Sequence, residues 1–325
     1  MSLKEIARIV GVSPSTVSRV LNGKSDSCAS RPVRDAIFDA AAALNYRPNQ
    51  AARLLRTGEK DREKPLRAAI ILARIRSLED DPFFLELYRA LKEELYLQGF
   101  RDAGLLREEE DFSRAKADGF LILGRCSDAL LGAVRTVTRN VVGVWRNPLN
   151  FELDEVVCDG AKAAAMAMEH LLALGHKKIA YIGDCSYESR YVGYCETLIR
   201  HNIPINYQII FPIRQHRQAG YEAMEKLLAG GQATAVLCAN DISAVGALAA
   251  QKSSRARRKP CVISIDDIEQ AQETRPLLTT VHIPRRDMAH MAVLLLRDRI
   301  GGGHRECLRV EFPGRLVERE SVWPL

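Results

Sequence analysis

The 325-residue sequence lacks the features of membrane and disulfide-stapled proteins. No apolar run reaches the roughly 18 residues that a transmembrane helix needs. The eight cysteines include no CxxC pair and the seven histidines show no zinc-ligand spacing, so we expect reduced, mostly buried thiols and no metal site. Charges interrupt the apolar pattern of the first ten residues, and no cleavage site follows. We therefore expect a cytoplasmic protein.

Catalytic motifs are missing as well. The sequence has no GxxxxGK[ST], no GxGxxG and no GxSxG, which excludes a phosphate loop and a nucleophile elbow. Neither paired carboxylates nor a nucleophile–base set is evident. The sequence therefore predicts that the chain is not an enzyme and needs no cofactor.

Charge is distributed unevenly. Residues 1–58 hold nine Lys and Arg against four Asp and Glu, a net charge of +5, whereas the whole chain carries +6. A small basic segment on a nearly neutral body is typical of a protein that binds the phosphate backbone of DNA.

The first 44 residues show the pattern of a helix-turn-helix. Ser2 and Glu5 form a capping box, and apolar residues recur at helical spacing as far as Val10. Gly11 permits a tight turn, and Ser13-Pro14 begins a second helix. That helix has an apolar inner face and an outer face of Ser15, Ser18, Arg19 and Asn22. Arginine can bond guanine O6 and N7, whereas serine and threonine can bond phosphates.

Three further segments complete the predicted head. A third helix is expected from Ser30 to about Leu44. Residues 49–58 are basic and rich in Ala and Leu, too short for a stable isolated helix, and could fold where two copies meet on DNA. Residues 59–65, EKDREKP, are a predicted linker. The expected domains are thus 1–58, the linker 59–65 and a body at 66–325.

In the body, apolar strand candidates alternate with helical patterns. The strand candidates are 67–73, 119–123, 141–145, 178–182, 235–238 and 261–265, and the helical stretches are 83–98, 161–174, 219–229 and 242–251. This alternation predicts a doubly wound, parallel α/β sheet with a ligand site at the carboxyl ends of its strands.

The segments VSPSTVSRVLNGK and LNYRPNQAARLLRTG resemble the signature of the LacI–GalR family of bacterial repressors. Later segments, including HLLALGHKKIAYIGD, CANDISAVGALAA and PLLTTVHIP, resemble family landmarks along the body. The resemblance implies a three-helix head with a hinge helix and a two-lobed body similar to periplasmic sugar-binding proteins. The lobes would comprise 66–157 plus 286–312, and 158–285 plus the end. A short, acidic segment at 100–118, after DPFF, weakly resembles repressors of β-galactosidase operons.

The resemblance also implies which residues contact DNA. These are Ser13, Pro14, Ser15, Thr16, Ser18, Arg19 and Asn22 in the head, and Asn49, Ala52 and Leu55 in the hinge. Leu55 would act as an apolar wedge that unstacks one base step at the operator centre, or it could instead pack on the body as linker core.

By the same resemblance, the effector-binding residues are Phe83, Phe84, Trp145, Arg190, Asn240 and Asp266. Trp145 stands where many sugar-responsive members have an aspartate, and Gln215 where an aromatic often lines the cleft. Several alternatives stay open: Asp241 could cap the following helix, Phe84 could be core, Arg190 could pair with Glu188 or Asp184 at the surface, and Asp266 could be a turn residue.

The sequence therefore predicts a homodimeric repressor of a palindromic operator, controlled by a sugar-like effector. One alternative has the same architecture with a purine or a protein co-repressor as effector. A sugar-transport protein is a further alternative, which the head and the missing signal peptide disfavour.

Overall fold

The computed structural model describes residues 3–21, 29–44, 65–75, 77–79, 81–149, 151–186 and 188–325. The chain divides into two compact units, Met1–Lys64 and Pro65–Leu325. Within the described part, no helix has the length and apolar character needed to cross a membrane. The described cysteines form no disulfide.

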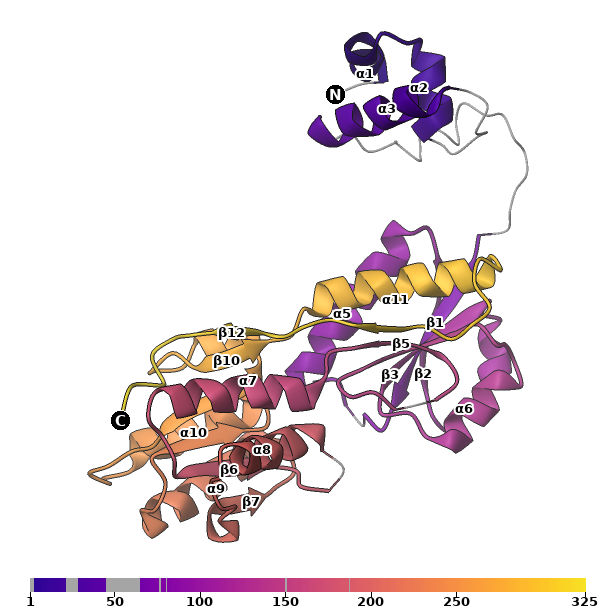
Figure 1. The fold of residues 1–325 in the computed structure, drawn as a ribbon. Coiled ribbons are helices and arrows are strands. Elements are labelled where there is room, and N and C mark those ends of the chain that lie inside the picture. Colours follow the sequence, from indigo (N-terminus) through magenta and orange to yellow (C-terminus); the bar gives the residue numbers. More distant parts are fainter. Residues whose placement is uncertain are drawn as a thin grey trace. The chain divides into compact units, whose positions relative to one another are not determined.

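The first unit contains the helices α1 (Leu3–Val10), α2 (Pro14–Leu21) and α3 (Arg31–Ala43) (Figure 1). Each helix contacts the other two, and their shared core consists of Ile6, Ala7, Val17, Val20, Ile37, Ala40 and Ala41. Between α1 and α2 the backbone of Gly11 has a φ of +73°, a left-handed conformation that glycine adopts without strain. The predicted pattern of inner apolar residues thus forms the core of a helix-turn-helix.

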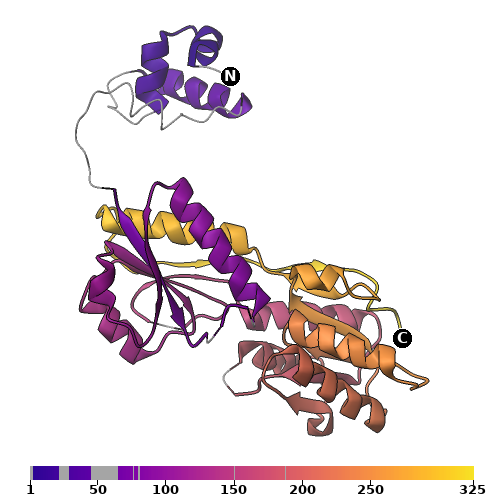
Figure 2. The same ribbon diagram turned by 180° about the vertical axis from the view of Figure 1, so that it is seen from behind.

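The second unit holds two six-stranded sheets, each the centre of one lobe (Figures 1 and 2). The N-lobe sheet is fully parallel and has the order β11-β5-β4-β3-β1-β2. Its strands are β1 (Arg67–Ala73), β2 (Arg101–Arg107), β3 (Gly119–Gly124), β4 (Val141–Trp145), β5 (Asp154–Val157) and β11 (Arg309–Glu311). The helices of this lobe are α5 (Pro82–Leu97), η1 (Phe112–Ala115), α6 (Asp128–Arg135) and α11 (Arg285–Ile300).

The C-lobe sheet has the order β12-β10-β9-β8-β6-β7, and only its edge pair β10–β12 is antiparallel. Its strands are β6 (Ile179–Gly183), β7 (Ile210–Pro212), β8 (Ala235–Cys238), β9 (Cys261–Asp266), β10 (Thr279–His282) and β12 (Arg315–Val317). Its helices are α7 (Gly160–Ala173), α8 (Ser189–Arg200), η2 (Tyr207–Ile209), α9 (Arg217–Gly230), α10 (Asp241–Ser253) and η3 (Glu269–Gln272).

The chain passes between the lobes after β5, after β10 and after β11. Consequently α11 lies beside α5 and against β3, β4 and β5 of the N-lobe, although it follows the C-lobe in sequence (Figure 1). Helices cover both faces of the N-lobe sheet. Residues 68–73 of β1 are buried throughout, and alternate residues join different apolar clusters.

Every predicted strand and helix of the body has a counterpart in the structure, within a few residues at its ends. The fold class is therefore confirmed: a helix-turn-helix head and a two-sheet, parallel-rich α/β body. Other elements were not predicted, and they include β2, β5 and β10. The hinge at 49–55 and nearly all of the linker lie outside the described residues, and so does Ser2 of the expected capping box.

Candidate DNA interface and effector cleft

The second helix of the head begins with a side-chain cap. Ser13 Oγ accepts a hydrogen bond from the Thr16 amide at 3.1 Å and lies 2.8 Å from Thr16 Oγ1 and 2.7 Å from Ser15 Oγ. Because the cap satisfies an amide that has no partner within the helix, it fixes where α2 starts.

Capping and packing together orient the outer face of α2. Val17 and Val20 are buried against α1 and α3, so Ser15 and Arg19 are exposed and Thr16 and Ser18 half-buried. Ser13 and Pro14 are exposed at the start of the helix. The predicted DNA contacts of the head thus lie on one accessible surface, while Asn22, Asn49, Ala52 and Leu55 lie outside the described residues.

In the second unit, a cavity of about 980 Å³ lies where the two lobes meet. It opens at the carboxyl ends of strands from both sheets, where parallel α/β proteins bind ligands. The N-lobe contributes Ala73, Arg74, Ile75, Phe84, Gly124, Arg125 and Trp145–Leu149, and the C-lobe contributes Asp184, Ser186, Glu188–Arg190, Val192 and Pro212–Gln215. Its size falls within the range of about 300–1,000 Å³ that is usual for small-molecule sites.

Arg190 lies in the wall of this cavity with its guanidinium already bonded. Its Nε donates to Glu188 Oε1 at 2.8 Å, and its Nη2 donates to Glu188 Oε2 at 2.7 Å and to Gln215 Oε1 at 2.9 Å. Its Nη1 donates to the Ala239 carbonyl at 2.6 Å. Burial by itself would raise the pKa of Glu188, but the charge and hydrogen bonds of Arg190 lower it to about 2. The alternative of an ion pair with Glu188 is therefore observed, but buried rather than at the surface.

Asp266 ends β9 and is 1% exposed. Its Oδ2 accepts from Arg146 Nη2 at 3.0 Å, while its Oδ1 has no protein partner among the described residues. Burial raises the pKa of Asp266 to about 6, although the charges of Arg146 and Arg190 act in the opposite direction. A buried carboxylate oxygen without a partner is an acceptor that ligand hydroxyls can satisfy.

The turn Ala239-Asn240-Asp241 after β8 corrects the alternative that Asp241 caps the following helix. Asp241 does not cap α10: Asn240 does, because its Oδ1 accepts from the Ser243 amide at 3.2 Å. Asp241 is instead fully buried, accepting from the Thr280 hydroxyl at 2.6 Å, the Ile268 amide at 2.9 Å and the Ser264 hydroxyl. Burial, followed by the charge of Asp266, raises the pKa of Asp241 to about 7. The side chain of Asn240 thus shapes the turn, and it does not line the cavity.

The predicted aromatic residues take different positions. Phe84 lines the cavity, whereas Phe83 is buried in the core at 1% exposure. Trp145 borders the cavity but is 2% exposed, and its Nε1 donates to Glu155 Oε2 at 2.7 Å. Its ring lies over Gly143, where an added Cβ would come within 1.9 Å of it. Trp145 therefore supports the wall of the cavity.

Sequence reasoning missed Arg146, whose guanidinium carbon lies 4.0 Å from the ring centroid of Phe83 and 4.7 Å from that of Phe84. Its place directly after the strand at 141–145 is a signal that could have identified it, because loops after parallel strands form the ligand site. Glu188 was considered only as a surface partner.

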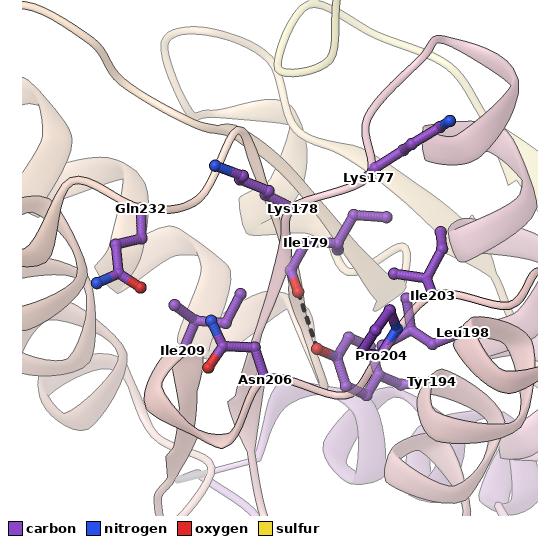
Figure 3. Close-up of a pocket in the computed structure, with 10 residues that line it drawn as sticks. All are labelled: Lys177, Lys178, Ile179, Tyr194, Leu198, Ile203, Pro204, Asn206, Ile209 and Gln232. Atoms are coloured by element: carbon purple, nitrogen blue, oxygen red, sulfur yellow. Dashed lines mark hydrogen bonds between the residues drawn. The ribbon is translucent and has the colours of Figure 1, made fainter.

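A smaller cavity of about 320 Å³ lies at the amino end of β6, lined by Lys178, Ile179, Tyr194, Asn206 and their neighbours (Figure 3). There the Tyr194 hydroxyl donates to the Ile179 carbonyl at 2.8 Å. This cavity lies at the amino ends of the C-lobe strands, whereas Asp266 lies at the carboxyl end of β9. It contains none of the predicted effector residues.

Fold and cavity together define a class: a helix-turn-helix joined to a two-lobed binding body, the architecture of a DNA-binding regulator that senses a ligand. Residues 2–49 match the profile of bacterial regulatory proteins of the lacI family, and residues 168–322 match that of a periplasmic binding protein-like domain. The chain therefore combines a DNA-binding head of the lacI family with a body of the periplasmic binding protein-like type.

Similarity to individual proteins extends along the whole chain. The transcriptional repressor PurR of Mannheimia succiniciproducens is 29% identical over 345 residues, covering 99% of this chain and 98% of the relative. PurR of Photorhabdus laumondii is 29% identical over 344 residues, covering 99% of this chain and 96% of the relative. Since these relatives are transcriptional repressors, they support the interpretation as a regulator rather than an enzyme.

Solved structures give the same result for the fold. The regulator CelR in complex with cellobiose has a TM-score of 0.70 at 24% identity, covering 99% of this chain and 100% of CelR. A ribose-bound LacI-family regulator from Enterococcus faecium has a TM-score of 0.70 at 26% identity, covering 80% of this chain and all of that one. The lac repressor dimer bound to operator and the anti-inducer ONPF has a TM-score of 0.68 at 23% identity, with 99% of both chains covered.

Proposed function

We propose that this regulator is a cytoplasmic homodimer that represses transcription at a palindromic operator and responds to a small neutral sugar bound between its lobes. We also propose the domain boundaries 1–58, 59–65 and 66–325. The observation that carries the effector proposal is the cavity at the carboxyl ends of both sheets, whose lining residue Arg146 is bonded to the buried carboxylate of Asp266. One oxygen of that carboxylate has no partner among the described residues.

The proposed recognition surface is the outer face of α2. Arg19 is exposed on it beside Ser15, and a protruding guanidinium can form two hydrogen bonds to guanine in the major groove. A single short helix reads few base pairs, so two copies related by a two-fold axis would read two half-sites. The lac repressor, of similar fold, is a dimer bound to operator.

The proposed effector is a polyol because the cavity offers closely spaced hydrogen-bonding groups. The amide of Asn147 and the hydroxyls of Ser186 and Ser189 lie at its wall, and the carboxylate of Asp266 lies behind Arg146. Sugars present several hydroxyls that can both donate and accept. The similar regulators CelR and that of E. faecium were solved with cellobiose and ribose respectively.

A purine is the second candidate, since the relatives that match the chain over its full length are named PurR. Thermal shift assays of the full chain with separate panels of neutral sugars and of purine bases decide between the two. Stabilisation by a sugar supports the proposal, whereas stabilisation by purines alone contradicts it.

The recognition surface is tested by selection of binding sites from random DNA. Arg19→Ala is expected to weaken the selected operator by about 1–3 kcal/mol per half-site and to relax the choice at one base pair. Arg8→Ala, an exposed arginine on α1, is the charge-matched control. It should affect selected and random DNA alike. An Arg19→Ala protein that keeps the wild-type ratio of the two affinities would show that Arg19 does not read bases.

A further inference from the structure

The side chain of Arg146 joins the two lobes inside the cavity. The residue follows β4 of the N-lobe, and its Nη2 lies 3.0 Å from Oδ2 of Asp266, at the end of β9 in the C-lobe. The same nitrogen lies 3.5 Å from Asp81 Oδ1, and the Arg146 side chain is only 12% exposed. Both charged groups are shielded from water, so their attraction is screened less than that between exposed charges.

The guanidinium also covers an aromatic surface. Its central carbon lies 4.0 Å from the ring centroid of Phe83 and 4.7 Å from that of Phe84, the one of the two rings that lines the cavity. A planar cation at this distance is attracted to the ring faces. Arg146 thus makes, from within the chain, the stacking and the carboxylate hydrogen bond that a sugar ring would make with the same residues.

The arrangement leaves two buried polar atoms without a partner among the described residues: Nε of Arg146 and Oδ1 of Asp266. Unpaired buried donors and acceptors are costly, so Arg146 satisfies this subsite only in part. A ligand whose hydroxyls donate to both oxygens of Asp266 would satisfy the carboxylate better.

Other contacts between the lobes do not occupy the subsite in this way. Ser189 Oγ donates to Asn147 Oδ1 at the side of the cavity, and Arg285 binds the main-chain carbonyls of Asp266 and Asp267 where the chain crosses between lobes. Arg146 contacts both aromatic rings and the Asp266 carboxylate. Arg285 lies farther from the Phe83 ring centroid, at 5.6 Å, and bonds Asp266 through its main-chain carbonyl.

We propose that Arg146 is an intramolecular ligand of the effector cleft, which holds the two lobes together when no effector is bound and which a neutral sugar must displace. The proposal rests on the proposed function for the identity of the effector, but not for the closure of the lobes. An internal ligand in place about nine-tenths of the time weakens the apparent affinity for the sugar about tenfold. Arg146 therefore determines which ligands bind: those that replace both its stacking on the aromatic rings and its hydrogen bond to Asp266.

The closure is tested by measuring the distance between lobes in the full chain by double electron–electron resonance. Spin labels are attached through p-acetylphenylalanine at Ala129 and Gln218, exposed residues on α6 and α9 near the two sides of the cavity. Without sugar, Arg146→Met should shift the distribution to longer distances than in the otherwise wild-type protein. Arg146→Gln, a milder change, should do the same and serves if the methionine variant misfolds. Arg258→Met removes an exposed arginine between α10 and β9 that does not line the cavity, and it should leave the distances unchanged.

Calorimetric titration with ribose and cellobiose supplies the second readout. A sugar that binds should bind Arg146→Met about tenfold more tightly than wild type, and Arg258→Met with the wild-type affinity. Lobes that open in the variant while neither sugar binds would support the internal ligand and count against the neutral-sugar effector. Unchanged distances without sugar in both Arg146 variants would overturn the proposal and leave the proposed function standing. A sugar affinity that falls in Arg146→Met would also overturn it, since Arg146 would then be a direct ligand contact.

Discussion

Replacing Arg190 by methionine is the perturbation with the largest expected effect on the body. The guanidinium is 2% exposed and makes four hydrogen bonds, two of them to the carboxylate of Glu188. Methionine fills a similar volume but leaves Glu188 buried without its cation. The Ala239 carbonyl and the Gln215 side chain also lose their donor.

The magnitude follows from the burial of the pair. Removal of one partner from a buried ion pair costs about 3–5 kcal/mol, because a charge is left uncompensated in a medium of low dielectric constant. At roughly 2–4 °C per kcal/mol for domains of this size, the midpoint of thermal unfolding should fall by about 6–20 °C. The double variant Glu188→Met/Arg190→Met removes both charges and should recover most of that loss.

Urea unfolding followed by tryptophan fluorescence measures this cycle. Both tryptophans of the chain, Trp145 and Trp323, lie in the body, so the signal does not include the head. This prediction is wrong if Arg190→Met costs less than about 1 kcal/mol, the range of exposed ion pairs, or if the loss of stability in the double variant equals the sum of the losses in the single ones. A stable double variant that no longer responds to effector would assign Arg190 a part in binding as well as in stability.

Three further predictions concern packing and pH. Gly246→Ala in α10 should destabilise the body by about 1–3 kcal/mol, since the added Cβ would lie 1.9 Å from the Arg217 carbonyl oxygen. Gly132→Ala in α6 has no atom within 4 Å and should instead stabilise by up to about 1 kcal/mol, and equal effects in urea unfolding would contradict the packing argument. Burial raises the pKa of Asp241 from its ordinary value of 3.8 to about 7, so between these two pH values the folded state holds a proton that the unfolded state has lost. Its contribution to the free energy of unfolding should therefore decline as pH rises from about 4 to about 7, and Asp241→Asn should flatten that decline; an unchanged slope would assign the pH dependence to other groups. Ile37→Ala, in the core of the head, should cost about 2–5 kcal/mol and abolish operator binding, while the tryptophan-detected unfolding of the body stays as in wild type.

Local signals explain why most elements could be predicted. The cap at Ser13, the turn at Gly11 and the apolar spacing of α1 and α2 act within a few residues, so they are visible in the sequence. The same holds for the central strands, whose continuous apolar runs reflect burial on both faces. By contrast, β2 is an edge strand with exposed polar residues, and β5 begins with the buried acids Asp154 and Glu155.

Those acids show what the sequence could not reveal. Asp154 is bonded to Arg299 in the last turn of α11 and to His304 beyond that helix, and Glu155 is bonded to Trp145. Such partners lie up to 150 residues away, so their burial cannot be inferred from local pattern. The same limit applies to the cleft. Arg190 and its partner Glu188 are near in sequence, but Arg146 and Asp266 are 120 residues apart and come into contact only in the folded chain.

Control of operator binding by a sugar is tested most directly by fluorescence anisotropy. Labelled operator, selected from random DNA, is titrated with the full chain with and without the sugar that stabilises it. The selected operator should bind more tightly than a scrambled duplex at the same salt concentration. Saturating sugar should then change the operator Kd by about 5–150-fold, the usual range of allosteric coupling. Equal affinity for operator and scrambled DNA, or an operator Kd that saturating ligand leaves unchanged, would contradict the proposed function.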